Sequence, residues 1–203
     1  MNERYPQIVL ASASPRRREL LTQLGLDIAV VPSRAAELFQ TGETPAQHAE
    51  RLSRDKAREV ASRAGQPGRW FVGSDTIVVL DDTILGKPLD AADAKSMLGR
   101  LAGREHCVIS GYAVLDRQTD HMVSGIVITR VFFKPLTARE IEGYIATGEP
   151  FDKAGSYAIQ GIGAFMVPRI EGSYSNVVGL PLCEVMAALE GLGAVELFAV
   201  GSE

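Results

Sequence analysis

Histidine and cysteine are scarce in this chain, with three and two residues among 203. His48, His106 and His121 stand far apart, so they form no spacing that is typical of a zinc site. Cys107 and Cys183 form no Cys-x-x-Cys pair and lie in apolar stretches, which predicts buried thiols in a reducing compartment. A catalytic metal would therefore be held by carboxylate, phosphate and water oxygens, which favour a hard ion such as Mg²⁺ or Mn²⁺.

Long apolar runs are missing as well. No run approaches the roughly 20 residues that a membrane helix requires, and the N-terminus lacks the basic and apolar segments of a signal peptide. The formal net charge is -4 and the pI about 5.5, which argues against a nucleic-acid polymer as partner. These absences predict a cytoplasmic protein with no membrane or nucleic-acid partner. A small phosphorylated ligand stays open, because it needs only a local cluster of cations.

The composition is that of an ordinary globular protein, with 46% hydrophobic and 23% charged residues. The length fits a single domain over residues 1–203, with or without two lobes. Apolar runs predict strands at 8–11, 28–31, 70–80, 83–85, 107–115, 122–133 and 164–170. Capping residues and apolar periodicity predict helices at 15–24, 44–64, 91–101, 137–147 and 181–189. The two long central strands form a hairpin, so we expect an α/β fold with a mixed sheet.

Three arginines, Arg16, Arg17 and Arg18, follow Ser14 and Pro15 in the first turn of a predicted helix. Cations there oppose the helix dipole, at a cost of about 0.3–1 kcal/mol each when solvated. A bound phosphate would reverse that sign, because backbone N–H and guanidinium groups would converge on it. The alternative is a solvated basic turn or ion pairs with nearby glutamates. The pattern favours the phosphate site.

Asp75 stands inside the apolar strand predicted at 70–80. An ionised carboxylate is costly in such a place without a partner. A role as metal ligand or general base would explain its presence. The alternative is a bulge at Gly73 that turns Asp75 to solvent, and the local sequence does not separate the two interpretations.

Lysines in turns and a glycine-rich segment are further candidates. Lys56, Lys87 and Lys153 are each more often solvated surface residues, but together with Arg16 they have the charge to neutralise a triphosphate. Residues 152–163 are small enough for close backbone approach to a ligand, and the segment includes Gln160, a donor and an acceptor. Its alternative is an ordinary turn, which is also the favoured interpretation of residues 172–182.

Five motifs together resemble those of a known family, in its order: Ser12-Ala13-Ser14-Pro15-Arg16-Arg17, Gly73-Ser74-Asp75-Thr76, Gly86-Lys87-Pro88, Asp152-Lys153-Ala154-Gly155 and Val178-Gly179-Leu180-Pro181. The chain resembles the Maf family, the septum-formation-inhibitor-like nucleoside triphosphate pyrophosphatases. The similarity runs from about residue 8 to residue 189 and leaves short tails.

The resemblance implies a two-lobed α/β fold, like that of inosine triphosphatases, with the nucleotide in the cleft between the lobes. It implies hydrolysis to a monophosphate and pyrophosphate, a divalent metal (Mg²⁺ or Mn²⁺) and commonly a homodimer. Arg16, Thr76 and Gln160, the last within residues 152–161, together resemble the branch that acts on dTTP and UTP, a house-cleaning role with a link to cell division arrest. The alternatives are the same chemistry on 7-methyl-GTP or a modified pyrimidine, and a non-catalytic nucleotide-binding regulator of division.

The resemblance also implies roles for single residues. Asp75 would accept the proton of the attacking water, and Glu37 and Asp75 would hold the metal. Phosphate contacts would come from Ser14, Arg16, Arg17, Lys56, Lys87 and Lys153. Base preference would be set by Arg16, Thr76 and Gln160. Many members have an acidic pair where this chain has Ala36-Glu37.

Overall fold

The protein is built on one seven-stranded mixed sheet, seen in a computed structural model that describes residues 7–198. The strands are β1 (Ile8–Leu10), β2 (Ile28–Val30), β3 (Trp70–Leu80), β4 (Thr83–Leu85), β5 (Glu105–Asp116), β6 (His121–Phe132) and β7 (Arg169–Glu171). Their order is β2-β1-β3-β5-β6-β7, with β4 paired to β3. Strand β1 runs parallel to β2 and β3, and the other pairs are antiparallel. The expected α/β fold with a mixed sheet is confirmed.

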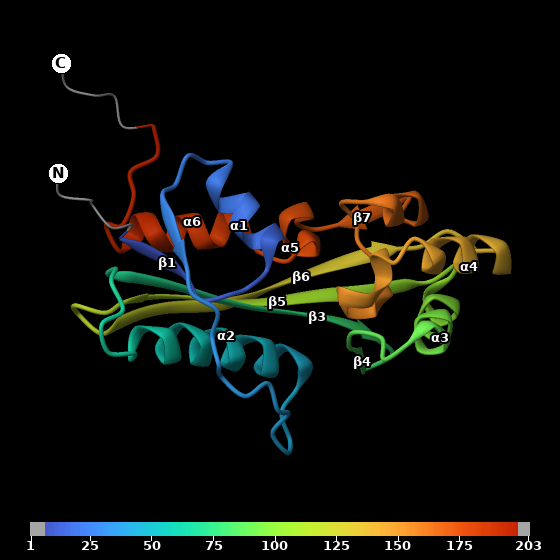
Figure 1. Ribbon diagram of the computed structural model, residues 1–203, viewed down its shortest axis with the longest axis horizontal. Helices are drawn as coiled ribbons and strands as arrows, with labels where there is room; N and C mark the ends of the chain where they lie inside the picture. The colour runs from blue at the N-terminus through green and yellow to red at the C-terminus, as the bar shows by residue number, and fades with distance from the viewer. Residues whose placement is uncertain (1–6, 199–203) are drawn as a thin grey trace.

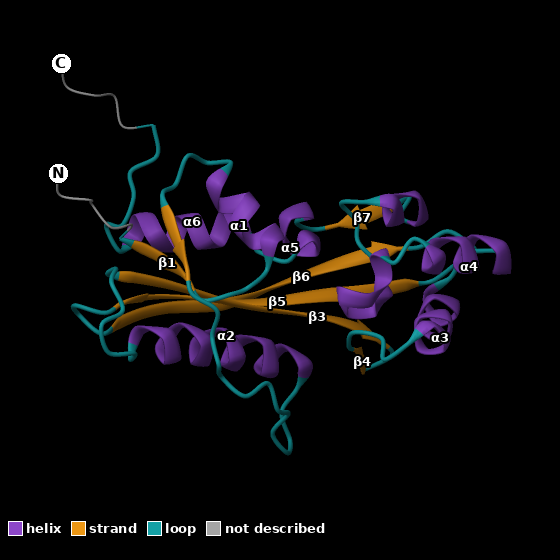
Figure 2. Ribbon diagram, viewed as in Figure 1, coloured by secondary structure: helices purple, strands orange, loops and turns teal. Residues whose placement is uncertain are grey.

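Helices cover both faces of the sheet (Figures 1 and 2). The α-helices are α1 (Pro15–Thr22), α2 (Pro45–Ala61), α3 (Ala91–Leu101), α4 (Ala138–Ala146), α5 (Tyr174–Val178) and α6 (Leu182–Gly191). Three 3₁₀ helices follow α4: η1 (Glu149–Asp152), η2 (Ala154–Ser156) and η3 (Ile162–Met166). Helix α2 lies alone below the sheet in Figure 1, while α1, α5 and α6 lie above it. No helix within residues 7–198 has the length and apolar character to cross a membrane.

Helix α2 lies directly on the sheet because two facing positions have no side chain. A Cβ at Gly73 would overlap the carbonyl oxygen of Ser53, and one at Gly111 would overlap that of Ala49. Residue 111 is the β5 partner of Asp75, so both glycines flank that carboxylate on the α2 face. The close approach sets the distance at which α2 side chains reach Asp75.

Gly73→Ala is expected to lower the free energy of unfolding by about 3 kcal/mol, because the methyl group forces α2 off the sheet. Urea denaturation measures the change. The control is Gly143→Ala on α4, where a Cβ meets nothing within 4 Å. It should raise stability by about 0.5–1 kcal/mol through helix propensity. Equal effects of the two substitutions would contradict the close packing of α2.

Two hydrophobic cores on either side of the middle of β3 define two lobes, and smaller clusters pack α2 against the sheet. One packs α1 and α6 against β1 and the start of β3, and it includes Leu10, Leu21, Val72, Leu180 and Leu189. The other packs α3 and α4 against the end of β3, and it includes Leu80, Leu98, Leu101, Tyr144 and Met166. Between them β3 has an open edge. Strand β1 pairs with residues 70–72 and β4 with residues 78–80, so residues 73–77 are paired with β5 alone.

The structure corrects several local predictions. The strand expected at 164–170 begins inside the 3₁₀ helix η3, which ends at Met166, and only Arg169–Glu171 pairs with β6. The turn expected at 172–182 contains helix α5. Strand β3 has no bulge at Gly73, which stays in register with Ala113. The prediction of two buried thiols is also wrong, because Cys183 is exposed and Cys107 is partly exposed.

Candidate active site

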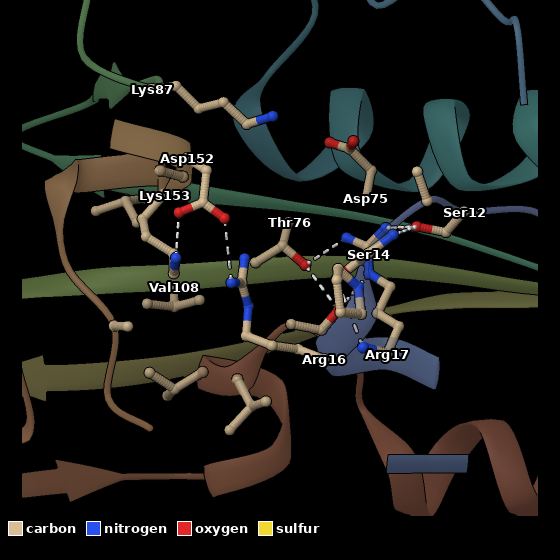
Figure 3. Close-up of a pocket in the computed structure, with 18 of the residues that line it drawn as sticks. Ser12, Ser14, Arg16, Arg17, Asp75, Thr76, Lys87, Val108, Asp152 and Lys153 are labelled. Atoms are coloured by element: carbon tan, nitrogen blue, oxygen red, sulfur yellow. Dashed lines mark hydrogen bonds and ion pairs between the residues drawn. The ribbon is translucent and has the colours of Figure 1, made fainter. Parts of the chain in front are cut away.

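A pocket of about 420 Å³ lies at the open edge of β3 and is lined by residues of both lobes. All ten residues to which the family resemblance gave a role line it: Ser14, Arg16, Arg17, Glu37, Lys56, Asp75, Thr76, Lys87, Lys153 and Gln160 (Figure 3 shows several of them). Asp75 and Thr76 lie in the open-edged stretch of β3 and Lys56 lies within α2, whereas the others come from loops and from the start of α1. Arg18, also expected near an anion, is exposed and does not line the pocket.

Asp75 and Glu37 meet at the ammonium group of Lys56. Lys56 Nζ lies 2.7 Å from Asp75 Oδ1 and 2.6 Å from Glu37 Oε1. Lys56 and Asp75 are 7% and 8% exposed, so each offsets the cost of burying the other's charge. Asp75 points into the pocket beside α2, which contradicts the alternative of a bulge that turns it to solvent.

These two carboxylates also fit a hard divalent cation. Mg²⁺ and Mn²⁺ bind carboxylate oxygens, and Mg²⁺ commonly takes one or two from the protein and the rest from phosphate and water. In the described part of the chain, no cluster of three or more His, Cys, Asp and Glu side chains offers a site made by protein alone. Glu37 and Asp75 are therefore suited to a metal that arrives with a polyphosphate.

Arg17 connects three segments of the site: the loop before α1, strand β3 and the turn after α5. Its guanidinium donates to the carbonyl oxygens of Ser74 at 2.8 Å and Gly179 at 2.7 Å. It also donates to the hydroxyl oxygens of Ser12 at 2.9 Å and Thr76 at 3.1 Å. Four of its five N–H groups are thus committed to the protein. Burial lowers the pKa of Arg17, which the nearby Asp75 charge opposes. These contacts favour a positioning role over the phosphate contact that the resemblance implied.

Arg16 points the other way, across the pocket to the second lobe. Its guanidinium lies 3.6 Å from the carboxylate of Asp152, which also pairs with Lys153 (Figure 3). Burial raises the pKa of Asp152, but the hydrogen bond from Lys153 and the charge of Arg16 outweigh it and hold the pKa below its usual value. The long Arg16 contact leaves its N–H groups available to an anion in the pocket.

The remaining predicted residues differ in how many hydrogen bonds their side chains make to the rest of the protein. Lys87 is exposed, and its ammonium group points toward the space beside Asp75. Thr76 is bound on three sides, since its hydroxyl contacts Arg17, Ser110 and the Gly179 carbonyl. Ser14 caps α1 through a long bond of 3.5 Å to the Arg17 amide. Gln160 lines the pocket from the loop between η2 and η3.

Sequence reasoning missed part of the lining. Gly179 was assigned to a structural turn, but its carbonyl binds Arg17 and Thr76. Tyr157, which sequence reasoning did not single out, also lines the pocket, and its hydroxyl lies 2.8 Å from His106 Nε2. Gly179 could have been predicted as a site residue, because it lies in the family motif Val178-Gly179-Leu180-Pro181. No local pattern pointed to the pairing of residues 106 and 157.

The buried His106 predicts an acid-sensitive stability. Burial lowers the pKa of His106 to about 4, against 6.5 in the unfolded chain. Between these values the unfolded state binds more protons, so the free energy of unfolding falls as pH drops. From pH 7 to pH 5 the loss from this residue is about 2 kcal/mol. Urea unfolding of the native protein and of His106→Gln at both pH values measures it. An identical pH slope in the variant would contradict the assignment.

The fold and the site define an α/β protein whose interlobe pocket combines paired carboxylates with several cations, which suits a polyanionic ligand with a metal. The family profile described as Maf-like protein matches residues 7–192. The chain belongs to the Maf family.

Several curated relatives share the name dTTP/UTP pyrophosphatase. The protein from Syntrophotalea carbinolica is 68% identical over 192 residues, which is 95% of this chain and 87% of its own. That from Geotalea uraniireducens is 54% identical over 97% of this chain and 100% of its own. The protein from Geobacter sulfurreducens is 57% identical over 93% of this chain and 98% of its own. A solved nucleoside-triphosphatase / dITP/XTP pyrophosphatase from Mycobacterium abscessus covers 92% of this chain and 94% of its own, at 15% identity and a TM-score of 0.41.

Proposed function

We propose that the protein hydrolyses dTTP and UTP to the nucleoside monophosphate and pyrophosphate. The observation that carries the proposal is the placement of Asp75, a buried carboxylate inside a pocket otherwise rich in cations. The names of the relatives support the reaction and the two substrates. Binding of a nucleotide alone requires no general base, whereas hydrolysis does, and the buried Asp75 carboxylate in this pocket is suited to be one.

The proposed reaction divides the work among the side chains of the pocket. Asp75 accepts the proton of the attacking water at Oδ2, since Oδ1 is occupied by Lys56. Arg16, Lys87 and Lys153 offset the charge of the triphosphate, which otherwise slows the approach of water. Arg17 holds the α1 and β3 segments at fixed positions relative to each other, so that base and cations meet one substrate.

A divalent metal is part of this proposal. Glu37 and Asp75 would hold it, and it would supply charge neutralisation of the phosphates and a lower pKa for the attacking water. Lys56 fixes both carboxylates by its contacts of 2.6 and 2.7 Å, so it orients the two oxygen ligands. Chelation with EDTA is expected to abolish turnover, and added Mg²⁺ or Mn²⁺ to restore it.

Base selection is proposed for the loop that includes Gln160, whose amide offers a donor and an acceptor to the imide edge of thymine or uracil. Arg16 and Thr76 are the other proposed specificity positions. The single-domain organisation, the homodimer and the cytoplasmic location stay predictions.

A nucleotide panel tests the function. Purified protein with Mg²⁺ or Mn²⁺ is assayed on dTTP, UTP, CTP, dATP, GTP and 7-methyl-GTP, with separate detection of pyrophosphate and orthophosphate. We expect equal amounts of pyrophosphate and monophosphate, with the highest kcat/KM for dTTP and UTP. Release of orthophosphate alone would refute the reaction. Tight binding without turnover would favour the non-catalytic regulator, and a preference for 7-methyl-GTP would favour that alternative substrate.

A further inference from the structure

The segment that includes Gln160 is held at both ends by two side chains outside the pocket lining. Before it, the hydroxyl of Tyr144 accepts a hydrogen bond from the Ala158 amide at 3.2 Å. After it, the carboxylate of Glu149 accepts hydrogen bonds from the amides of Ile162 and Gly163, both at 3.0 Å. The two side chains are also joined, since the Tyr144 hydroxyl donates to Glu149 Oε1 at 2.8 Å. We call this pair the Tyr144–Glu149 clamp.

Glycines make room for the clamp. A Cβ at Gly161 would overlap the Glu149 carboxylate. A Cβ at Gly163 would lie 2.8 Å from the Tyr144 hydroxyl and 2.6 Å from the Ala158 carbonyl oxygen. The Gly-Ile-Gly sequence at 161–163 thus has a physical reason in the contacts of Glu149 and Tyr144. It lets the backbone fold tightly around a carboxylate.

The protonation states of the clamp suit its geometry. Burial, together with the hydrogen bond to Glu149, raises the pKa of Tyr144, so the hydroxyl stays a donor. Burial also raises the pKa of Glu149, but the amide donors of Gly163 and Ile162 outweigh it, so the carboxylate stays an acceptor. Tyr144 is anchored on α4 and only 2% exposed, so it ties the loop to the core of the second lobe.

We propose that Tyr144 and Glu149 are positioning residues that hold the Gln160 segment in the shape that selects the nucleobase. The inference rests on the proposed function, because it takes Gln160 to face the base. The clamp side chains make no hydrogen bond to Asp75 or to a pocket cation. However, Lys153 Nζ lies 3.4 Å from the Glu149 carbonyl oxygen and its charge attracts the Glu149 carboxylate, so Tyr144 is the member that acts on the loop alone. Its loss should therefore change selectivity more than it changes the chemical step.

The test compares native protein with Tyr144→Phe and Glu149→Gln, and uses Tyr174→Phe as matched control. Tyr174 is 49% exposed on α5, outside the pocket lining. We expect the ratio of kcat/KM for UTP to that for GTP to fall about tenfold in both clamp variants, mainly through a higher KM for UTP. That equals the loss of about one hydrogen bond, since a factor of ten is about 1.4 kcal/mol. The inhibition constant of inorganic tripolyphosphate, which has no base, should change less than twofold in Tyr144→Phe, which keeps the Glu149 charge near Lys153.

A double-mutant cycle with Gln160→Ala separates the clamp from a general structural role. If the clamp acts through Gln160, Tyr144→Phe should lower the UTP to GTP ratio no further in the Gln160→Ala background. The clamp is refuted if the ratio stays within twofold of native, or if tripolyphosphate inhibition weakens as much as UTP binding. If Tyr144→Phe fails to fold, the UTP to GTP ratio of Glu149→Gln, a substitution at a partly exposed site, decides whether the clamp selects the base.

Failure of the proposed function is a separate result. Native protein that turns over no triphosphate refutes the pyrophosphatase, and the clamp is then decided by dissociation constants for UTP and GTP. Hydrogen exchange gives a readout that needs no ligand: residues 158–163 should exchange faster in Tyr144→Phe and not in Tyr174→Phe. Unchanged exchange in Tyr144→Phe would refute the clamp whatever the protein hydrolyses.

Discussion

Asp75→Asn is expected to lower kcat for dTTP and UTP by about a thousandfold and to leave the fold intact, since general-base catalysis contributes about 10²–10⁴. Asparagine has the shape of aspartate and keeps an oxygen for Lys56 at the 2.7 Å position. Its amide cannot accept the proton of the attacking water. Pyrophosphate release under saturating substrate measures the loss, and thermal unfolding shows whether the fold is kept.

Asp116→Asn is the matched control, because Asp116 is also a buried aspartate paired with a cation. It is 2% exposed and bound by Arg69 at 2.9 and 2.7 Å, at the end of β5 and outside the pocket lining. The hydrogen bonds from Arg69 hold the pKa of Asp116 well below its usual range, against the effect of burial. We expect this variant to lose stability and keep kcat. Turnover by Asp75→Asn at the rate of Asp116→Asn would remove Asp75 from the mechanism.

The elements of this fold were largely predictable, because their signals are local. Thr137 and Glu140 form the capping box that the sequence predicted for α4, and Asp90 caps α3. The Asp81-Asp82 turn into β4 has the positive φ angles of a tight hairpin. Strand length in the last third was not predictable. The apolar run at 164–170 has no β partner over most of its length and turns into 3₁₀ helix η3 around Gly163.

The membership of the site was predictable, but the tasks of its members were not. Motif order brought all ten residues to one pocket, yet motif letters do not say which way a side chain points. The gap between β1 and β4 along β3 creates the pocket, and pairing between strands distant in sequence has no local signature. The pairing of Tyr144 with Glu149 is close in sequence, but its meaning depends on where the 158–163 loop returns.

Arg17→Met is expected to lower the free energy of unfolding by about 3 kcal/mol or more, while Arg16→Met leaves it within about 0.5 kcal/mol. The difference follows from contacts made by neighbours in one helical turn. Methionine at position 17 leaves the carbonyl oxygens of Ser74 and Gly179 without their guanidinium donor in a buried place. Arg16 loses only a 3.6 Å contact to Asp152. Urea denaturation of both variants measures the two changes.

Turnover should be lost at position 16, whereas stability is lost at position 17. Arg16→Met is expected to lower kcat/KM for dTTP about 10- to 100-fold in a stable protein, which is the effect of one charged hydrogen bond to a phosphate. Arg18→Met, at an exposed position off the pocket, controls for lost positive charge and should change neither quantity. If Arg17→Met were as stable as Arg18→Met but inactive, Arg17 would be a phosphate ligand as the family motif implied. Loss of stability at position 17 and of turnover at position 16 would instead mean that the three arginines divide into a structural, a binding and a solvated residue.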